Sequence, residues 1–253
     1  MLPNNPHRRR ANCRGLLAWF CGTLTLVVAG SGCQMMSHTQ NSDGVRMFQQ
    51  AYYQGALQSF QQAIQSDPKN PDGYYNLART YHQLGKLHNQ PTDLQQAESY
   101  YHQCLDRDPN KQDCYRGLAV LLMEQNRSGD AFKLMEGWAT RNPSLASPKI
   151  ELARLYEETG NRDAAKSQLI EAVGVDPSNS RALAALGKLR EDAGETVQAL
   201  ANYQRSLQLN PNQPQLASRV GAISTPVAPM APPPGTIPAG APRWVAAPQG
   251  PVR

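Results

Sequence analysis

Five prolines, each preceded by Asp or Asn, recur along the middle of the chain at regular intervals. They are Pro68, Pro109, Pro143, Pro177 and Pro211. The first interval is 41 residues and each of the other three is 34 residues. Equal intervals of this length indicate an internal repeat, in which each unit is one supersecondary element that stacks on the next. We attribute the longer first interval to a seven-residue insertion near Leu87 to Asp93.

Small residues recur at two fixed positions in each unit. Twelve residues before each proline stands an alanine: Ala56, Ala97, Ala131, Ala165 and Ala199. A second column contains only Gly or Ala: Gly44, Ala78, Ala119, Ala153 and Gly187. Small side chains allow two helices to approach closely, so the sequence predicts one helical hairpin per unit.

Helix ends are predicted from Gly, Asn and Pro. Gly and Asn tolerate the left-handed backbone that often ends a helix. We therefore expect the hairpin turns at Gly85, Asn126, Gly160 and Gly194. Proline disfavours a helical residue before it, so the second helix of each unit should end at the Asp/Asn-Pro pair.

These columns resemble the tetratricopeptide repeat over about residues 37 to 213. The resemblance implies an all-α fold, a right-handed α-solenoid of about five helical hairpins plus a C-terminal capping helix, over residues 37–223. The capping helix is expected from Pro214 to Ile223. The resemblance also implies that the first helices line a concave groove that binds a segment of a protein or peptide partner. The implied groove residues are Tyr75, Arg79, His82, Arg116, Val120, Arg154 and Lys188.

Charge divides this predicted groove into a basic first half and a more acidic second half. The first half carries Arg79, His82 and Arg116, and the second carries acidic residues that include Glu151 and Glu191. Such a division could orient a dipolar partner segment. The alternative is an ordinary solvated surface, on which exposed charges contribute little.

Residues 1–32 have the order of a secretory signal of the lipoprotein type. A basic cluster precedes an uncharged apolar run from Leu16 to Gly30, which is shorter than a membrane-spanning helix needs. The run ends in a segment, 29–33, that resembles the lipobox of bacterial lipoproteins, although Gly30 stands where that family prefers Leu or Val. The alternative is an uncleaved N-terminal anchor.

The lipobox resemblance implies lipidation of Cys33, with a short linker over residues 33–36. The chain is then expected to be lipid-anchored in the outer membrane or the cell membrane and to face the periplasm. At the other end, residues 224–253 are predicted to be a disordered tail, because they are rich in proline and contain no acid. This tail is either a spacer or a ligand in which Trp244 acts as an anchor.

No catalytic, cofactor-binding or metal-binding motif occurs in the sequence, so we expect no enzyme activity, no cofactor, no metal and no small-molecule substrate. From residue 33 onward, 21 basic residues stand against 20 acidic ones, which disfavours nucleic acid as a partner. Cys104 and Cys114 flank Pro109. They either form a disulfide in an oxidising compartment or remain two buried thiols.

Together these features predict a membrane-anchored extracytoplasmic scaffold that binds a protein or peptide partner. The layout is similar to that of the pilotin lipoproteins that help to assemble type IV pilus secretins, which implies a role in assembling a pilus or secretion complex. One alternative is an adaptor lipoprotein that recruits cell-wall or exopolysaccharide machinery. A second alternative is an enzyme with an unrecognised site.

Overall fold

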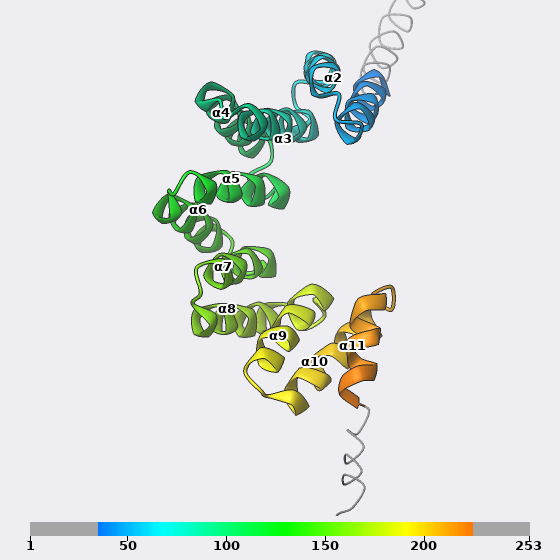
Figure 1. Cartoon of the computed structure of the whole chain (residues 1–253), viewed down its shortest axis with the longest axis vertical. Helices are drawn as coiled ribbons and strands as arrows, with labels where there is room; N and C mark the ends of the chain where they lie inside the picture. The colour runs from blue at the N-terminus through cyan, green and yellow to red at the C-terminus, as the bar shows by residue number, and fades with distance from the viewer. Residues whose placement is uncertain (1–34, 225–253) are drawn as a thin grey trace, which may run out of the picture.

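The computed structural model describes residues 35–224, and within them every regular element is an α-helix. The helices stack in chain order into an open crescent (Figure 1). The predicted all-α solenoid of helical hairpins is therefore confirmed. The predicted signal and Cys33 lie outside the described residues, as does the predicted tail except for its first residue, Ser224, which is helical.

A helix over residues 35–49 comes first, so helical structure includes two residues that the sequence assigned to a linker. The following helices are α2 (Tyr53–Ser66), α3 (Pro71–His88), α4 (Pro91–Arg107), α5 (Gln112–Glu124), α6 (Ser128–Arg141), α7 (Ala146–Glu158), α8 (Arg162–Val175), α9 (Ser180–Asp192), α10 (Thr196–Leu209) and α11 (Pro214–Ser224). The hairpins pair α3 with α4, α5 with α6, α7 with α8 and α9 with α10. The predicted capping helix is α11, which packs on α10.

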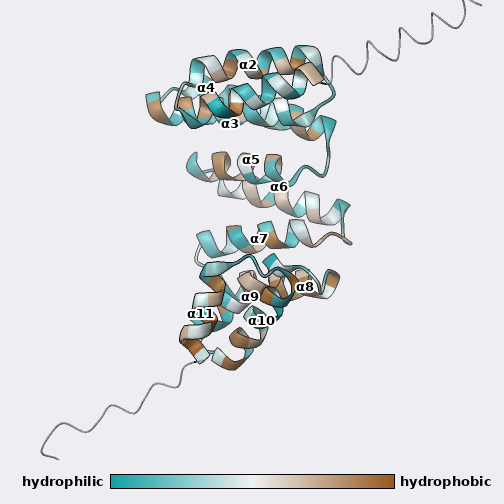
Figure 2. Cartoon of the chain, turned by 90° about the vertical axis from the view of Figure 1, so that its right-hand side faces the viewer, coloured by the Kyte–Doolittle hydropathy of each residue, from teal (hydrophilic) through white to brown (hydrophobic). Residues whose placement is uncertain are grey.

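The two columns of small residues form the contact inside each hairpin. All five residues of the alanine column are completely buried. A Cβ atom added to Gly187 would lie 2.5 Å from Cε1 of Tyr203, and one added to Gly44 would lie 2.5 Å from Cε1 of Phe60. The helices are thus as close as the small columns predict. Polar and apolar residues alternate around the helices, because each hairpin buries one face against its neighbours (Figure 2).

The insertion lengthens one hairpin instead of forming a loop. Helices α3 and α4 have 18 and 17 residues, whereas the helices from α5 to α10 have 13 or 14. The turn lies at Asn89, whose φ of 50° is left-handed. The predicted turn at Gly85 is therefore wrong. Gly85 is buried inside α3, where its missing side chain leaves room for Leu94 of α4.

The other predicted turns are confirmed. Asn126, Gly160 and Gly194 all have positive φ angles, at 61°, 81° and 78°. Each follows the last turn of a first helix, where a left-handed residue ends the helix. The repeat pattern located these turns correctly because their units contain no inserted residues.

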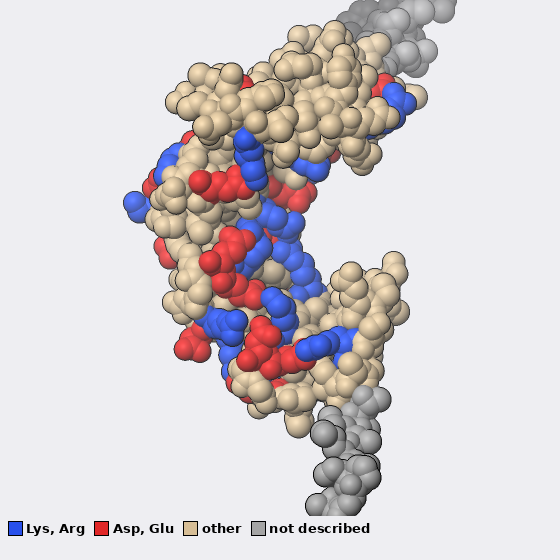
Figure 3. Space-filling view, viewed as in Figure 1, with Lys and Arg blue, Asp and Glu red and all other residues tan. Residues whose placement is uncertain are grey.

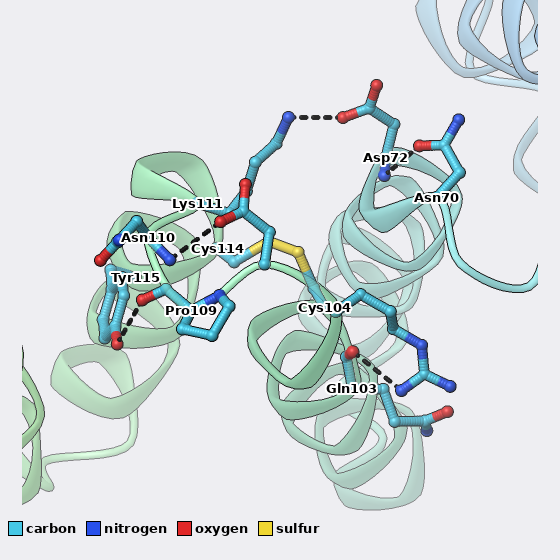
Figure 4. The surroundings of a disulfide bond; sticks show 11 residues. Asn70, Asp72, Gln103, Cys104, Pro109, Asn110, Lys111, Cys114 and Tyr115 are labelled. Atoms are coloured by element: carbon cyan, nitrogen blue, oxygen red, sulfur yellow. Dashed lines mark hydrogen bonds and ion pairs between the residues drawn. A yellow bond between two sulfur atoms is a disulfide. The ribbon is translucent and has the colours of Figure 1, made fainter.

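A disulfide joins the α3/α4 hairpin to the α5/α6 hairpin across a unit boundary (Figure 4). Cys104 of α4 and Cys114 of α5 have Cα atoms 6.4 Å apart, and both residues are buried. Next to it, the ring of Tyr115 stacks on Trp138 of α6 with centroids 4.2 Å apart. Of the two alternatives for these cysteines, the structure contains the disulfide. No helix within residues 35–224 has the length and apolar character needed to cross a membrane.

Candidate interaction groove

The first helices of successive hairpins form the inner side of the crescent. Helix α3 contacts α5, and α5 contacts α7, so these helices lie side by side along that surface. Figure 3 shows the inner side as a hollowed surface on which Lys, Arg, Asp and Glu side chains gather. Six of the seven groove residues predicted from the sequence fall into three places along this surface.

The first place is a hollow of about 460 Å³ near the N-terminal end, which contains the predicted residues Arg79, His82 and Val120. The guanidinium of Arg79 lies 4.2 Å from the ring centroid of Phe48, a cation–π contact. Nε2 of His82 lies 2.8 Å from Oε2 of Glu124. The hollow therefore combines aromatic rings with fixed charged groups.

Glu124 connects two helices in this hollow. Its other oxygen, Oε1, accepts a hydrogen bond of 2.6 Å from Nζ of Lys86. Partial burial would raise the pKa of Glu124, but the hydrogen bonds from Lys86 and His82 outweigh it and lower that pKa. The carboxylate therefore stays ionised and holds α3 and α5 together.

The second place is the middle of the groove, where Glu151 of α7 is completely buried. Its Oε1 accepts hydrogen bonds from Nη2 of Arg116 at 2.7 Å, Nη2 of Arg181 at 2.5 Å and Nε2 of Gln112 at 2.7 Å. Its Oε2 accepts a hydrogen bond of 3.1 Å from Nε of Arg154. Three arginines from α5, α7 and α9 thus share one carboxylate.

Burial alone would raise the pKa of Glu151, since it penalises the charged form. The hydrogen bonds from Arg116, Arg181 and Gln112 outweigh this penalty and hold the pKa at about 2. Glu151 is therefore an ionised group that anchors cations. The prediction that it contributes to an acidic surface is wrong, because its charge lies beneath the groove and is paired.

The third place is a hollow of about 380 Å³, which contains the predicted residues Arg154 and Lys188. Arg154 forms an ion pair with Glu158, and Nζ of Lys188 donates to Oε1 of Glu157 at 3.2 Å. Acidic and basic side chains alternate here. The expected division into a basic half and an acidic half is therefore not what the structure shows.

Two further features complete the groove. Tyr75 is half-buried beside Tyr101, with ring centroids 6.3 Å apart, and burial raises its pKa. A hollow of about 810 Å³ lies between α9, α10 and α11 at the C-terminal end. There Arg219 of α11 pairs with Glu191, which also accepts a hydrogen bond from the hydroxyl of Tyr203.

Neither Arg181 nor the anchoring role of Glu151 was predicted from the sequence. One signal could have shown it: Glu151 and Asn76 stand at the same place in their units, two residues before the Gly/Ala column. Asn76 is also buried, and its Nδ2 donates to Oδ1 of Asn41 at 2.8 Å. At these two positions, therefore, the column holds inward-facing polar groups. Among the described residues, no three His, Cys, Asp or Glu side chains are grouped so that they could hold a metal ion.

Family models cover most of the helical part of the chain. The model described as TPR repeat matches residues 46–85. Models described as tetratricopeptide repeat match residues 71–111, 92–146 and 150–214. The matched segments together extend from the first hairpin to the start of α11.

Two curated proteins illustrate the relatives of this chain. It is 23% identical over 188 residues to the DnaJ homolog subfamily C member 7 homolog of Schizosaccharomyces pombe, covering 70% of this chain and 40% of that protein. It is 26% identical over 139 residues to cellulose synthase operon protein C of Pseudomonas fluorescens, covering 52% of this chain and 11% of that protein. The chain spans less than half the length of either relative.

Solved structures share the fold. A thermophilic TPR protein of Thermus thermophilus matches with a TM-score of 0.53 at 24% identity, covering 74% of this chain and 98% of that protein. PilF of Pseudomonas aeruginosa matches with a TM-score of 0.50 at 16% identity, covering 76% of this chain and 86% of that protein. At these identities the likeness concerns the fold alone.

Proposed function

Because the chain belongs to the tetratricopeptide repeat family, whose members serve as scaffolds for protein interactions, we propose that it is a membrane-anchored scaffold that holds a partner segment in its concave groove. The observation that carries the proposal is the series of hollows along the inner side, lined by aromatic, aliphatic and charged side chains. Hollows of this kind suit an extended or helical segment laid across successive hairpins.

The anchor in this proposal is a lipid on Cys33 that holds the solenoid at the periplasmic side of a membrane. The charged-then-apolar order of residues 1–32 supports it. The buried disulfide between α4 and α5 also supports a location outside the reducing cytoplasm. Cells that express Cys33→Ser and are fed labelled palmitate test the anchor. We expect loss of label and release of the chain from the membrane fraction, whereas a labelled, membrane-bound variant would contradict it.

The process that we propose for this scaffold is assembly of a pilus or secretion complex. The support is the layout, a lipoprotein-type signal followed by tetratricopeptide repeats, together with the fold that it shares with PilF. Deletion of the gene in its own host tests this role. We expect the outer-membrane secretin to remain unassembled and assembly to return with the wild-type gene. Normal secretin assembly in the deletion strain would contradict the role.

One observation favours a second process, the export of a polysaccharide. The chain matches cellulose synthase operon protein C over 139 residues. In that case the scaffold recruits exopolysaccharide machinery. The same deletion strain separates the two processes: exported polysaccharide falls and secretin assembly stays normal if this second process is correct.

A further inference from the structure

Three arginines in the middle of the groove face outward over a buried anion. The side chain of Glu151 has no exposed surface, whereas Arg116, Arg154 and Arg181 are 38%, 26% and 45% exposed. The carboxylate therefore forms the floor, and the guanidinium groups form the surface that a ligand meets. They come from α5, α7 and α9, the first helices of three successive hairpins.

These guanidinium groups carry more N–H donors than Glu151 occupies. Arg116 uses Nε and Nη2 toward Glu151, and Arg181 uses Nη2. Arg154 uses Nε toward Glu151 and Nη1 toward Glu158, while its buried Nη2 has no hydrogen-bond partner among the described residues. The other nearby carboxylate is the exposed Asp113, which acts on Arg116 through its charge. Donors thus remain for a further acceptor.

We propose that Arg116, Arg154 and Arg181, hereafter the arginine clamp, bind a carboxylate side chain of the partner segment. This inference rests on the proposed function, since it names the chemistry of the segment held in the groove. An Asp or Glu side chain fits because a guanidinium fork presents paired donors to a planar carboxylate. The clamp places this acidic residue in the middle of the groove.

Glu151 is a positioning residue in this account. A long arginine side chain loses rotational freedom when it binds a ligand, which weakens binding. Here Glu151 already holds three guanidinium groups before any partner arrives. Binding therefore costs these side chains little further conformational entropy, because the fold already orders them. A carboxylate should bind more tightly than it would to three free arginines.

A displayed library of random 12-residue peptides, selected on the full-length chain in lipid nanodiscs, tests the inference. The tightest peptide is then made with a fluorescent label and an amidated C-terminus, together with a version in which Asn and Gln replace its Asp and Glu. Affinities are measured for the wild type, for Arg181→Gln, and for Arg205→Gln, which removes an exposed arginine of α10. Arg181→Gln leaves Glu151 bonded to Arg116, Arg154 and Gln112, and thermal unfolding checks its fold.

We expect selected peptides rich in Asp or Glu, and an affinity about tenfold weaker for Arg181→Gln but unchanged for Arg205→Gln. The peptide in which Asn and Gln replace Asp and Glu should bind the wild type more weakly than the original peptide does. This difference in affinity should be smaller for Arg181→Gln, because both changes remove the same contact. Selection of peptides without Asp or Glu would overturn the proposed arginine clamp while leaving groove binding intact. Equal affinity of the peptide for the wild type, Arg181→Gln and Arg205→Gln would do the same. Failure to select any peptide would contradict the proposed function itself.

Discussion

Two joints of the solenoid hold neighbouring hairpins together by different means. Between α4 and α5, the joint is covalent, with the Cys104–Cys114 disulfide beside the stacked rings of Tyr115 and Trp138. Across α5, α7 and α9, the joint is ionic and depends on Glu151. Units of one repeat pattern can therefore be joined by two unrelated kinds of bond, a disulfide and a shared carboxylate. The first joint should respond to reduction and the second to pH.

The ionic joint should show the largest effect on mutation. In Glu151→Gln, three arginines lose the carboxylate that they share, and breaking a buried ion pair typically costs about 3 to 5 kcal/mol. We expect the free energy of unfolding in urea to fall by this amount. Glu136→Gln, which changes an exposed carboxyl of α6, is the matched control. Equal stability of the two variants would contradict the ionic joint.

Acid should weaken the same joint without a mutation. The pKa of Glu151 is about 2 in the folded chain against an ordinary 4.5, so its contribution is complete above pH 4.5 and is lost as the pH falls toward 2. The difference corresponds to roughly 3 kcal/mol. We expect the stability gap between the wild type and Glu151→Gln to shrink over this range. A gap that stays constant down to pH 2 would show that Glu151 does not titrate as described.

The covalent joint should show a smaller effect. Replacing both Cys104 and Cys114 by alanine removes a bridge that spans 10 residues, which typically costs about 2 to 3 kcal/mol. Urea unfolding with and without a reductant measures the effect. Reduction should destabilise the wild type and leave the double variant unchanged. A wild type insensitive to complete reduction would contradict a stabilising bridge.

Two glycine substitutions, one at a close helix contact and one at an open position, should show the smallest effects on stability. A Cβ atom on Gly85 would lie 2.6 Å from Cδ2 and 3.1 Å from the backbone nitrogen of Leu94, so Gly85→Ala should cost about 1 to 3 kcal/mol. Gly129 of α6 has nothing within 4 Å of such an atom, so Gly129→Ala should gain about 0.5 to 1 kcal/mol. Thermal unfolding of both variants measures these changes. A neutral Gly85→Ala would show that the long hairpin is not tightly packed.

Most of the fold could be predicted because small residues at fixed positions indicate where two helices pack closely against each other. The alanine column predicted the position of the second helix in each unit, and the Gly/Ala column predicted the position of the first. The turn at Gly85 was predicted wrongly, since a repeat pattern cannot show whether inserted residues form a loop or extend two helices. The structure extends both helices, and the turn moves to Asn89.

The groove could be predicted only in part. Periodicity places Arg116 and Arg154 on the inner side, but it does not show that Arg181 reaches the same carboxylate from the next hairpin. Nor does it separate a buried anion from an exposed one, which is why Glu151 was assigned to an acidic surface. Such contacts depend on how far each hairpin rotates relative to its neighbour, and that rotation is set by packing between units.

Crosslinking from the groove and from an exposed site on α8 tests whether the groove is the binding surface. A photoreactive amino acid is placed at Val120, which lines the first hollow, or at Ile170, which is exposed on α8. After irradiation of living cells, mass spectrometry identifies the attached protein. We predict one partner, crosslinked from position 120 and absent from position 170. A partner attached only from position 170 would contradict the groove as the binding surface.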